Sequence, residues 1–130
     1  MKLLCVEDNA TQRRMIDLML AATGIDVDFA GSGTEALESF QLTAYDAVLM
    51  DSGLPDMTGA QAAHHMRQTE AGFGLPPTPM LFLGQPAGDD ASGDAYLIKP
   101  FTSERLMAAL DSLLRDATGS GLQGTLRRAR

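Results

Sequence analysis

The sequence has no tryptophan, a single cysteine and no long run of apolar residues. One cysteine, Cys5, cannot form an intramolecular disulfide, and its apolar neighbours predict a buried, inert thiol. No stretch approaches the roughly 18 apolar residues of a membrane span, and residues 1–6 are too few for a signal-peptide core. We therefore expect a cytoplasmic protein that does not bind membranes.

Positive charge is also scarce. The chain has 17 acidic residues against 10 basic ones, a formal net charge of −7 and a pI near 4.6. Because a negative surface repels nucleic acids and anionic lipids, we expect proteins or cations as partners and no nucleic acid. Hydrophobic residues make up 45% of the 130 residues, which indicates one globular domain rather than a disordered chain.

Short apolar runs alternate with helical patterns along the chain. The runs are residues 3–6, 27–30, 47–50, 80–83 and 96–98. Continuous apolar runs of this length are typical of strands buried on both faces. Helical patterns cover residues 10–22 and 103–115, and two more begin at Ser32 and Thr58, each followed three residues later by Glu or Gln. The alternation predicts a doubly wound α/β domain with a parallel sheet.

The first helical pattern, residues 10–22, has Asn9 as its expected cap. Gly24 follows it as a stop, and four apolar residues recur in it at helical spacing: Met15, Leu18, Met19 and Ala22.

The composition changes near residue 116. From Thr118 onward Gly and Ser precede an arginine-rich end. We interpret residues 1–116 as the one domain and residues 117–130 as a disordered tail or linker.

Acidic residues directly follow two of the expected strands. Glu7 and Asp8 come after the first strand and Asp51 after the third. Because the carboxyl ends of parallel strands share one edge of the sheet, these carboxylates should converge. Two like charges about 4 Å apart repel by about 4 kcal/mol at an effective dielectric of about 20, so three acids in one cleft need a compensating cation or must share protons. Mg²⁺ fits this need and favours a phosphoryl group as the guest.

Lys99 closes the fifth expected strand and is followed by Pro100. Its ammonium group at the same edge can neutralise a phosphoryl oxygen as a point charge. Attack by Asp51 would then yield an aspartyl phosphate.

Three segments carry a recognisable pattern. They are Val6-Glu7-Asp8-Asn9, residues 48–59 with the run Asp51-Ser52-Gly53-Leu54-Pro55, and Tyr96-Leu97-Ile98-Lys99-Pro100-Phe101. In this order and at these spacings they resemble the receiver family of response regulators, and the match spans roughly residues 1–116. The resemblance implies a CheY-like, flavodoxin-like domain whose five-stranded parallel sheet has the order 2-1-3-4-5.

The resemblance also implies roles for individual residues. By it, Asp51 is the phosphoacceptor, Asp8 binds Mg²⁺ directly and Glu7 acts largely through water. The backbone carbonyl of Gly53 is a further metal ligand. Lys99 contacts the phosphoryl group, and the Lys99–Pro100 bond is cis. Tyr96 falls at the family's aromatic switch position.

Two departures from the family pattern lie close together. The family has Thr or Ser at the end of the fourth strand, whereas this chain has Gly84, so coupling from a phosphoryl group to Tyr96 is in doubt. The ten residues 85–94 are rich in Gly, Pro and Asp, which is turn chemistry. We therefore expect the helix that the family carries between the fourth and fifth strands to be absent or very short.

The resemblance implies a place in two-component or phosphorelay signalling. The phosphoryl donor would be a histidine kinase or a histidine phosphotransfer protein, which in the family docks chiefly on the first helix. Exposed positions on that helix, Gln12, Arg13 and Asp17, are expected to set partner choice. The downstream protein is not identified by the sequence.

Two other functions compete with this interpretation. A receiver-like adaptor would bind partners without phosphorylation, which Gly84 and a missing helix would permit. A haloacid-dehalogenase-like phosphatase would need a second acid two residues after the nucleophile, where Gly53 stands. We expect no enzymatic activity beyond autocatalytic phosphoryl acceptance and slow autodephosphorylation.

Overall fold

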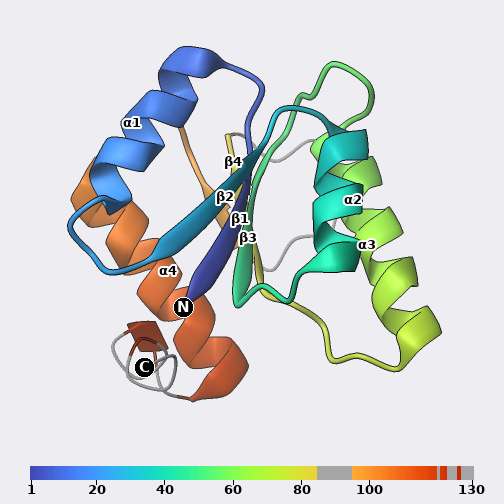
Figure 1. The fold of residues 1–130 in the computed structure, drawn as a ribbon. Helices are drawn as coiled ribbons and strands as arrows, with labels where there is room; N and C mark the ends of the chain where they lie inside the picture. The colour runs from blue at the N-terminus through green and yellow to red at the C-terminus, as the bar shows by residue number, and fades with distance from the viewer. Residues whose placement is uncertain (85–94, 120, 123–125, 127–130) are drawn as a thin grey trace.

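The computed structural model describes residues 1–84, 95–119, 121, 122 and 126. They build a fully parallel five-stranded sheet with helices on both faces (Figure 1). The strands are β1 (Lys2–Val6), β2 (Asp26–Ala30), β3 (Ala47–Asp51), β4 (Met80–Leu83) and β5 (Ala95–Leu97). Their spatial order is β2-β1-β3-β4-β5, so the expected α/β fold and the order 2-1-3-4-5 are confirmed.

Among the described residues, four helices cover the sheet in two pairs. They are α1 (Ala10–Leu20), α2 (Gly33–Leu42), α3 (Gly59–Phe73) and α4 (Ser103–Thr118). Figure 1 shows α1 and α4 on one face of the sheet and α2 and α3 on the other. The crossover from β1 to β2 runs in the opposite direction to those from β2 to β3 and from β3 to β4. Because crossovers between parallel strands are right-handed, α1 lies on one face and α2 and α3 lie on the other.

Each helix begins at a side chain that accepts a hydrogen bond from its first turn. The caps are Asn9, Ser32, Thr58 and Thr102. Thr58 and Gln61 form the full capping box that the sequence predicted, in which each side chain bonds the other residue's backbone N–H. The carboxyl ends of α3 and α4 stop at Gly74 and Gly119, both left-handed, where a glycine carries no steric penalty.

The strands bury side chains on both faces and so make two core layers. In β1, Leu3 and Cys5 point into the layer under α1 and α4, while Leu4 and Val6 point into the layer under α2 and α3. All four are fully buried. Burial raises the pKa of the Cys5 thiol to about 12, so this cysteine is an inert core residue, as expected.

The apolar residues that marked α1 in the sequence are not all buried. Ile16 and Leu20 are buried, whereas Met15 is 41% exposed and Leu18 is 61% exposed. Met19 is partly buried and packs against the core. Helical spacing identified the helix, and its packing against the sheet selected the side chains that are buried. Two large apolar side chains of α1 therefore face solvent.

Two further expectations concern residues 85–94 and the C-terminal end of the chain. The predicted loss of a helix between β4 and β5 falls on residues 85–94, which lie outside the described residues. Helix α4 continues two residues past the expected boundary at 116, and Leu122 beyond it is 8% exposed and packs on the core. Its N–H donates to Asp111 Oδ1 at 2.9 Å, which holds this part of the expected tail against α4. In the described part of the chain, no helix has the length and hydrophobicity that a membrane crossing requires.

Candidate functional site

The carboxyl edge of the sheet collects the expected site residues. Strand β1 ends at Val6 and β3 at Asp51, and the two strands are neighbours with Val6 paired to Met50. Glu7 directly after β1 therefore lies beside Asp51. Lys99 follows β5 by two residues and reaches back across β4 to the same edge. The convergence predicted from strand ends is what the structure shows.

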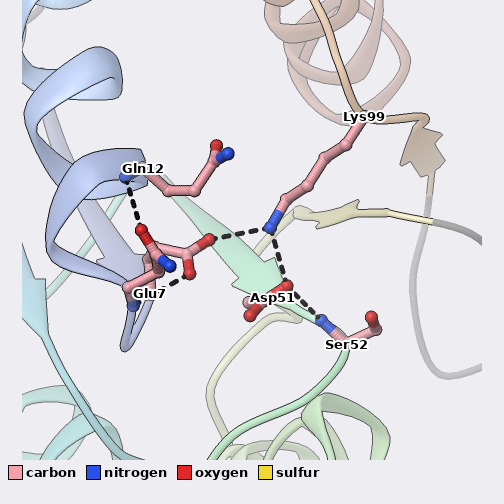
Figure 2. A network of polar contacts seen from close by, with 6 residues as sticks. Glu7, Gln12, Asp51, Ser52 and Lys99 are labelled. Atoms are coloured by element: carbon pink, nitrogen blue, oxygen red, sulfur yellow. Dashed lines mark hydrogen bonds and ion pairs between the residues drawn. The ribbon is translucent and has the colours of Figure 1, made fainter.

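Lys99 bridges the two buried carboxylates. Its Nζ donates to Glu7 Oε2 at 3.0 Å and to Asp51 Oδ1 at 3.0 Å, and Figure 2 shows its side chain reaching between them. The Glu7 side chain is 1% exposed, the Asp51 side chain 12% and the Lys99 side chain 26%. Because little solvent reaches these groups, the attraction between Lys99 and the two carboxylates is strong. Without the Lys99 ammonium, either buried carboxylate would destabilise the fold. The peptide bond from Lys99 to Pro100 is cis.

Burial and pairing shift the titration of these groups. Desolvation raises the pKa of Glu7 above its ordinary value, although hydrogen bonds from Lys99 and from the Asn9 N–H partly oppose the rise. Burial by itself lowers the pKa of Lys99, but its bonds to Glu7 and Asp51 outweigh that effect, and the net shift is upward. Lys99 is therefore held as a cation at neutral pH.

Asp8 completes a cluster that can hold a metal ion. Glu7, Asp8 and Asp51 each present a carboxylate oxygen, and these oxygens lie within 4.8 Å of one another. With all three ionised, their three negative charges exceed the single positive charge of Lys99 by two, which is the charge of a divalent cation. All the donors are oxygens, as Mg²⁺ prefers. The residues present therefore fit the predicted ion.

The loop after Asp51 is held in place by backbone hydrogen bonds. The Ser52 N–H donates to Asp51 Oδ1 at 3.0 Å, and the Gly59 N–H donates to the Ser52 carbonyl at 2.9 Å. Gly53 and Thr58 form an isolated antiparallel bridge between these points. The loop consequently presents Gly53, the expected carbonyl ligand, from a closed and defined turn.

Asp56 anchors the tip of this loop and was not predicted as a functional residue. Its carboxylate accepts from the Thr34 hydroxyl at 2.7 Å, and from the N–H groups of Gly33 at 2.8 Å and Thr34 at 2.9 Å. These bonds, with that of the Thr34 hydroxyl foremost, lower the pKa of Asp56 to about 2. No local signal marked it, because its partners lie 22 and 23 residues away in the sequence at the start of α2.

Gly84 and Tyr96, the expected switch positions, lie at the end of β4 and in β5. Gly84 directly follows β4 with a φ of +115°, a conformation that favours glycine. Tyr96 in β5 stacks against Phe82 of β4, with ring centroids 5.5 Å apart and planes tilted by 33°. The ring is partly buried, so it packs in the sheet layer under α2 and α3. A switching role for Tyr96 stays a prediction.

The expected docking residues are not equally exposed. Asp17 faces solvent, whereas Gln12 and Arg13 are only partly exposed. The Arg13 guanidinium lies over the Phe29 ring, 5.3 Å from its centroid, and Figure 2 shows the Gln12 side chain on the side of α1 that faces Lys99. The expectation that all three are exposed was wrong for these two, because α1 turns them toward β2 and toward the site. His64 and His65 are exposed on α3 and take no part in the site.

The sequence is similar to known signalling proteins over most of its length. Residues 3–111 match the response regulator receiver domain family. Response regulator ArlR of Staphylococcus saprophyticus is 32% identical over 121 residues, which are 88% of this chain and 52% of that protein. The chain thus spans about half the length of this curated relative.

Solved structures agree in fold and in extent. Chemotaxis protein CheY4 of Vibrio cholerae is 30% identical with a TM-score of 0.75, and the match covers 86% of this chain and 97% of that one. The receiver domain of sensor histidine kinase PA1611 from Pseudomonas aeruginosa has a magnesium ion coordinated in its active site cleft. It is 29% identical with a TM-score of 0.74, covering 87% of this chain and 96% of that one.

Proposed function

Because this chain belongs to the response regulator receiver domain family, we propose that Asp51 accepts a phosphoryl group in two-component or phosphorelay signalling. The observation that carries the proposal is the pairing of Lys99 with Asp51 and Glu7 beside a three-carboxylate cluster. A half-buried lysine that bridges two acids is poised to receive the charge of an incoming phosphoryl group. Asp51 is the one of these acids that ends a central strand and carries an open carboxylate oxygen.

The chemistry follows from the positions of these groups. Oδ2 or Oδ1 of Asp51 attacks phosphorus, and the bond from phosphorus to the donor's nitrogen or oxygen breaks with the electrons leaving on the donor. Lys99 donates a hydrogen bond to Asp51 before the reaction and can follow the phosphoryl oxygens afterwards as a point charge. Because the site is partly buried, the attraction between Lys99 and the phosphoryl oxygens is stronger than it would be in water.

Mg²⁺ is the proposed cofactor. Asp8, Asp51 and the Gly53 carbonyl would hold it, while Glu7, already bonded to Lys99 and the Asn9 N–H, would act through water. When bound, the ion neutralises charge on the phosphoryl oxygens and helps to orient them.

Mg²⁺ should stabilise the unchanged protein against heat. At a concentration 100 times its dissociation constant, a ligand specific to the folded state adds about 2.7 kcal/mol. In Glu7→Gln the affinity for Mg²⁺ should fall by about tenfold or more, because one of three carboxylates loses its charge. Calorimetric titration and thermal melts with and without Mg²⁺ measure both effects, and equal affinities of the two proteins would contradict the proposed role of Glu7.

The proposed function is tested by phosphoryl labelling. Incubation of the protein with acetyl phosphate and Mg²⁺ should add the mass of one phosphoryl group, measured on the intact chain. Removal of Mg²⁺ with a chelator should suppress the addition. Absence of labelling at any Mg²⁺ concentration would contradict the proposal.

The proposed phosphoryl donor is a histidine kinase or a histidine phosphotransfer protein, bound over α1 next to the cleft. The exposed Met15 and Leu18 side chains supply an apolar surface there, and Asp17 lies between them in the sequence with an exposed carboxylate. Gln12 and Arg13, which are partly exposed on the same helix, complete the proposed docking surface. The downstream protein and a cytoplasmic location stay predictions that rest on the family.

Docking should be separable from chemistry. Leu18→Asp should slow transfer from a histidine phosphotransfer protein that labels the unchanged chain by about tenfold or more, since it places a charge in a desolvated apolar contact. Labelling by acetyl phosphate, which needs no docking, should be unchanged. Asp17→Lys and the double swap of Gln12 and Arg13 test partner choice in the same assay. Equal transfer to all variants would remove α1 as the docking surface.

A receiver-like adaptor remains the second candidate because residue 84 has no hydroxyl to couple phosphorylation to Tyr96. Under that function, partner binding would be the same with and without Asp51 phosphorylation. Pull-down of a bound partner by the unchanged protein and by its Asp51→Asn variant distinguishes the two.

A further inference from the structure

Gly84 has no side chain, and the space beside it is bordered by the hydroxyl of Ser52. A Cβ added to Gly84 would lie 3.2 Å from Ser52 Oγ. The Gly84 N–H donates to the Leu97 carbonyl at 2.9 Å, which keeps the end of β4 next to β5. With a φ of +115°, this position disfavours any residue that could carry a hydroxyl of its own. The Ser52 hydroxyl therefore borders the place where a side chain of residue 84 would lie.

The backbone of Ser52 is fixed while its hydroxyl is not. Its N–H is bonded to Asp51 Oδ1 and its carbonyl accepts from the Gly59 N–H. In the described part of the chain its Oγ makes no hydrogen bond, and the residue is half-buried. Rotation about χ1 of Ser52 is the remaining freedom, and it moves the hydroxyl donor. The backbone nitrogen of Ser52 stays 3.0 Å from Asp51 Oδ1 (Figure 2).

A phosphoryl group on Asp51 needs more donors than Lys99 and a cation supply. It carries three outer oxygens, of which the Lys99 ammonium can bind one and the expected Mg²⁺ another. The third needs a further hydrogen-bond donor beside the Asp51 carboxylate. The Ser52 hydroxyl belongs to the residue that follows Asp51, and it makes no hydrogen bond among the described residues.

We propose that the Ser52 hydroxyl donates a hydrogen bond to the phosphoryl group on Asp51 and so replaces the hydroxyl that residue 84 lacks. The inference rests on the proposed function and assigns a phosphoryl-binding residue to the same site. It places the donor directly after β3, next to the phosphoacceptor, instead of directly after β4. Ser52 is held there by the closed turn up to Gly59.

Removing the hydroxyl should slow phosphoryl acceptance without weakening the metal site. Ser52→Ala should lower the rate of labelling by acetyl phosphate by about tenfold or more, the effect of one hydrogen bond to a charged group. Ser52→Thr keeps the hydroxyl and should label within about threefold of the unchanged rate, since only a group able to donate is required. Ser112→Ala, an exposed serine of α4, is the matched control and should label normally.

Binding measurements separate a missing phosphoryl contact from a damaged site. Ser52→Ala should bind Mg²⁺ as tightly as the unchanged protein but bind beryllofluoride, in the presence of Mg²⁺, about tenfold more weakly. Its melting temperature should be unchanged, because both backbone bonds of Ser52 persist. A parallel loss of Mg²⁺ affinity would overturn the inference, since the hydroxyl is assigned to the phosphoryl group and not to the ion.

The outcomes distinguish this inference from the function on which it rests. If the unchanged protein labels and Ser52→Ala labels at the same rate, the role of Ser52 is overturned while Asp51 stays the phosphoacceptor. If the unchanged protein does not label at all, both are overturned. A slow Ser52→Ala, a normal Ser52→Thr and equal Mg²⁺ affinities support the inference.

Discussion

Phosphoryl labelling should disappear when Asp51 is replaced by asparagine. The amide has no nucleophilic carboxylate oxygen, whereas its size and its acceptor oxygen are retained. Its Oδ1 can still accept from the Ser52 N–H and from Lys99, so the fold should persist. We expect no mass increase above background after incubation with acetyl phosphate and Mg²⁺, at a melting temperature close to that of the unchanged protein.

The control for this variant is an acidic residue of similar chemistry elsewhere. Asp116→Asn removes an exposed carboxylate near the end of α4 and should label normally. Persistent labelling of Asp51→Asn would place the acceptor on another acid of the cluster, and fragmentation of the labelled chain would show whether that acid is Asp8. Labelling that is unaffected in every acid-to-amide variant of the cluster would contradict phosphoryl acceptance at this edge.

Lys99→Met should damage both the fold and the chemistry. The variant leaves Glu7, 1% exposed, facing Asp51 without the cation that joins them. Breaking a buried pair on one side costs roughly 3 to 5 kcal/mol, and we expect about 3 kcal/mol here because the Lys99 side chain is partly open to solvent. Urea unfolding measures this loss. Labelling should slow by about a hundredfold or more, since the charge that stabilises the phosphoryl oxygens is gone.

The loss in Lys99→Met should depend on pH. Desolvation already raises the pKa of Glu7, and removal of Lys99 takes away a hydrogen bond that lowers it, so the pKa in the folded variant rises further. A carboxyl group whose pKa is higher in the folded than in the unfolded state is stabilising when protonated, and this stability is lost as pH rises through the folded value. The variant should therefore be closest to the unchanged protein near pH 5 and furthest from it near pH 8.

Lys2→Met is the control for this comparison. Lys2 pairs with Asp26 and Asp28 at 3.6 Å on a more exposed surface, so its loss should cost less than about 1 kcal/mol. An equal loss of stability in Lys99→Met at pH 5 and pH 8 would show that Glu7 does not carry the effect.

The sequence determined the fold class and most of the site because both follow from local patterns. Apolar runs buried on both faces specify parallel strands, and an acid or a lysine at a strand end is carried to one edge of the sheet whatever the details of packing. Glu7, Asp8, Asp51 and Lys99 were placed correctly on that basis. The caps at Asn9 and Thr58 were likewise predictable, because their partners lie three residues away.

Tertiary structure alone decided which surfaces face solvent and which distant groups meet. The composition of α1 permits more than one buried face, and its packing against the sheet chose Ile16 and Leu20 while exposing Leu18. Asp56 and the start of α2 are brought together by loops whose paths no local pattern specifies. Residues joined by a strand register can be predicted from sequence, whereas those joined across two loops depend on the packed structure.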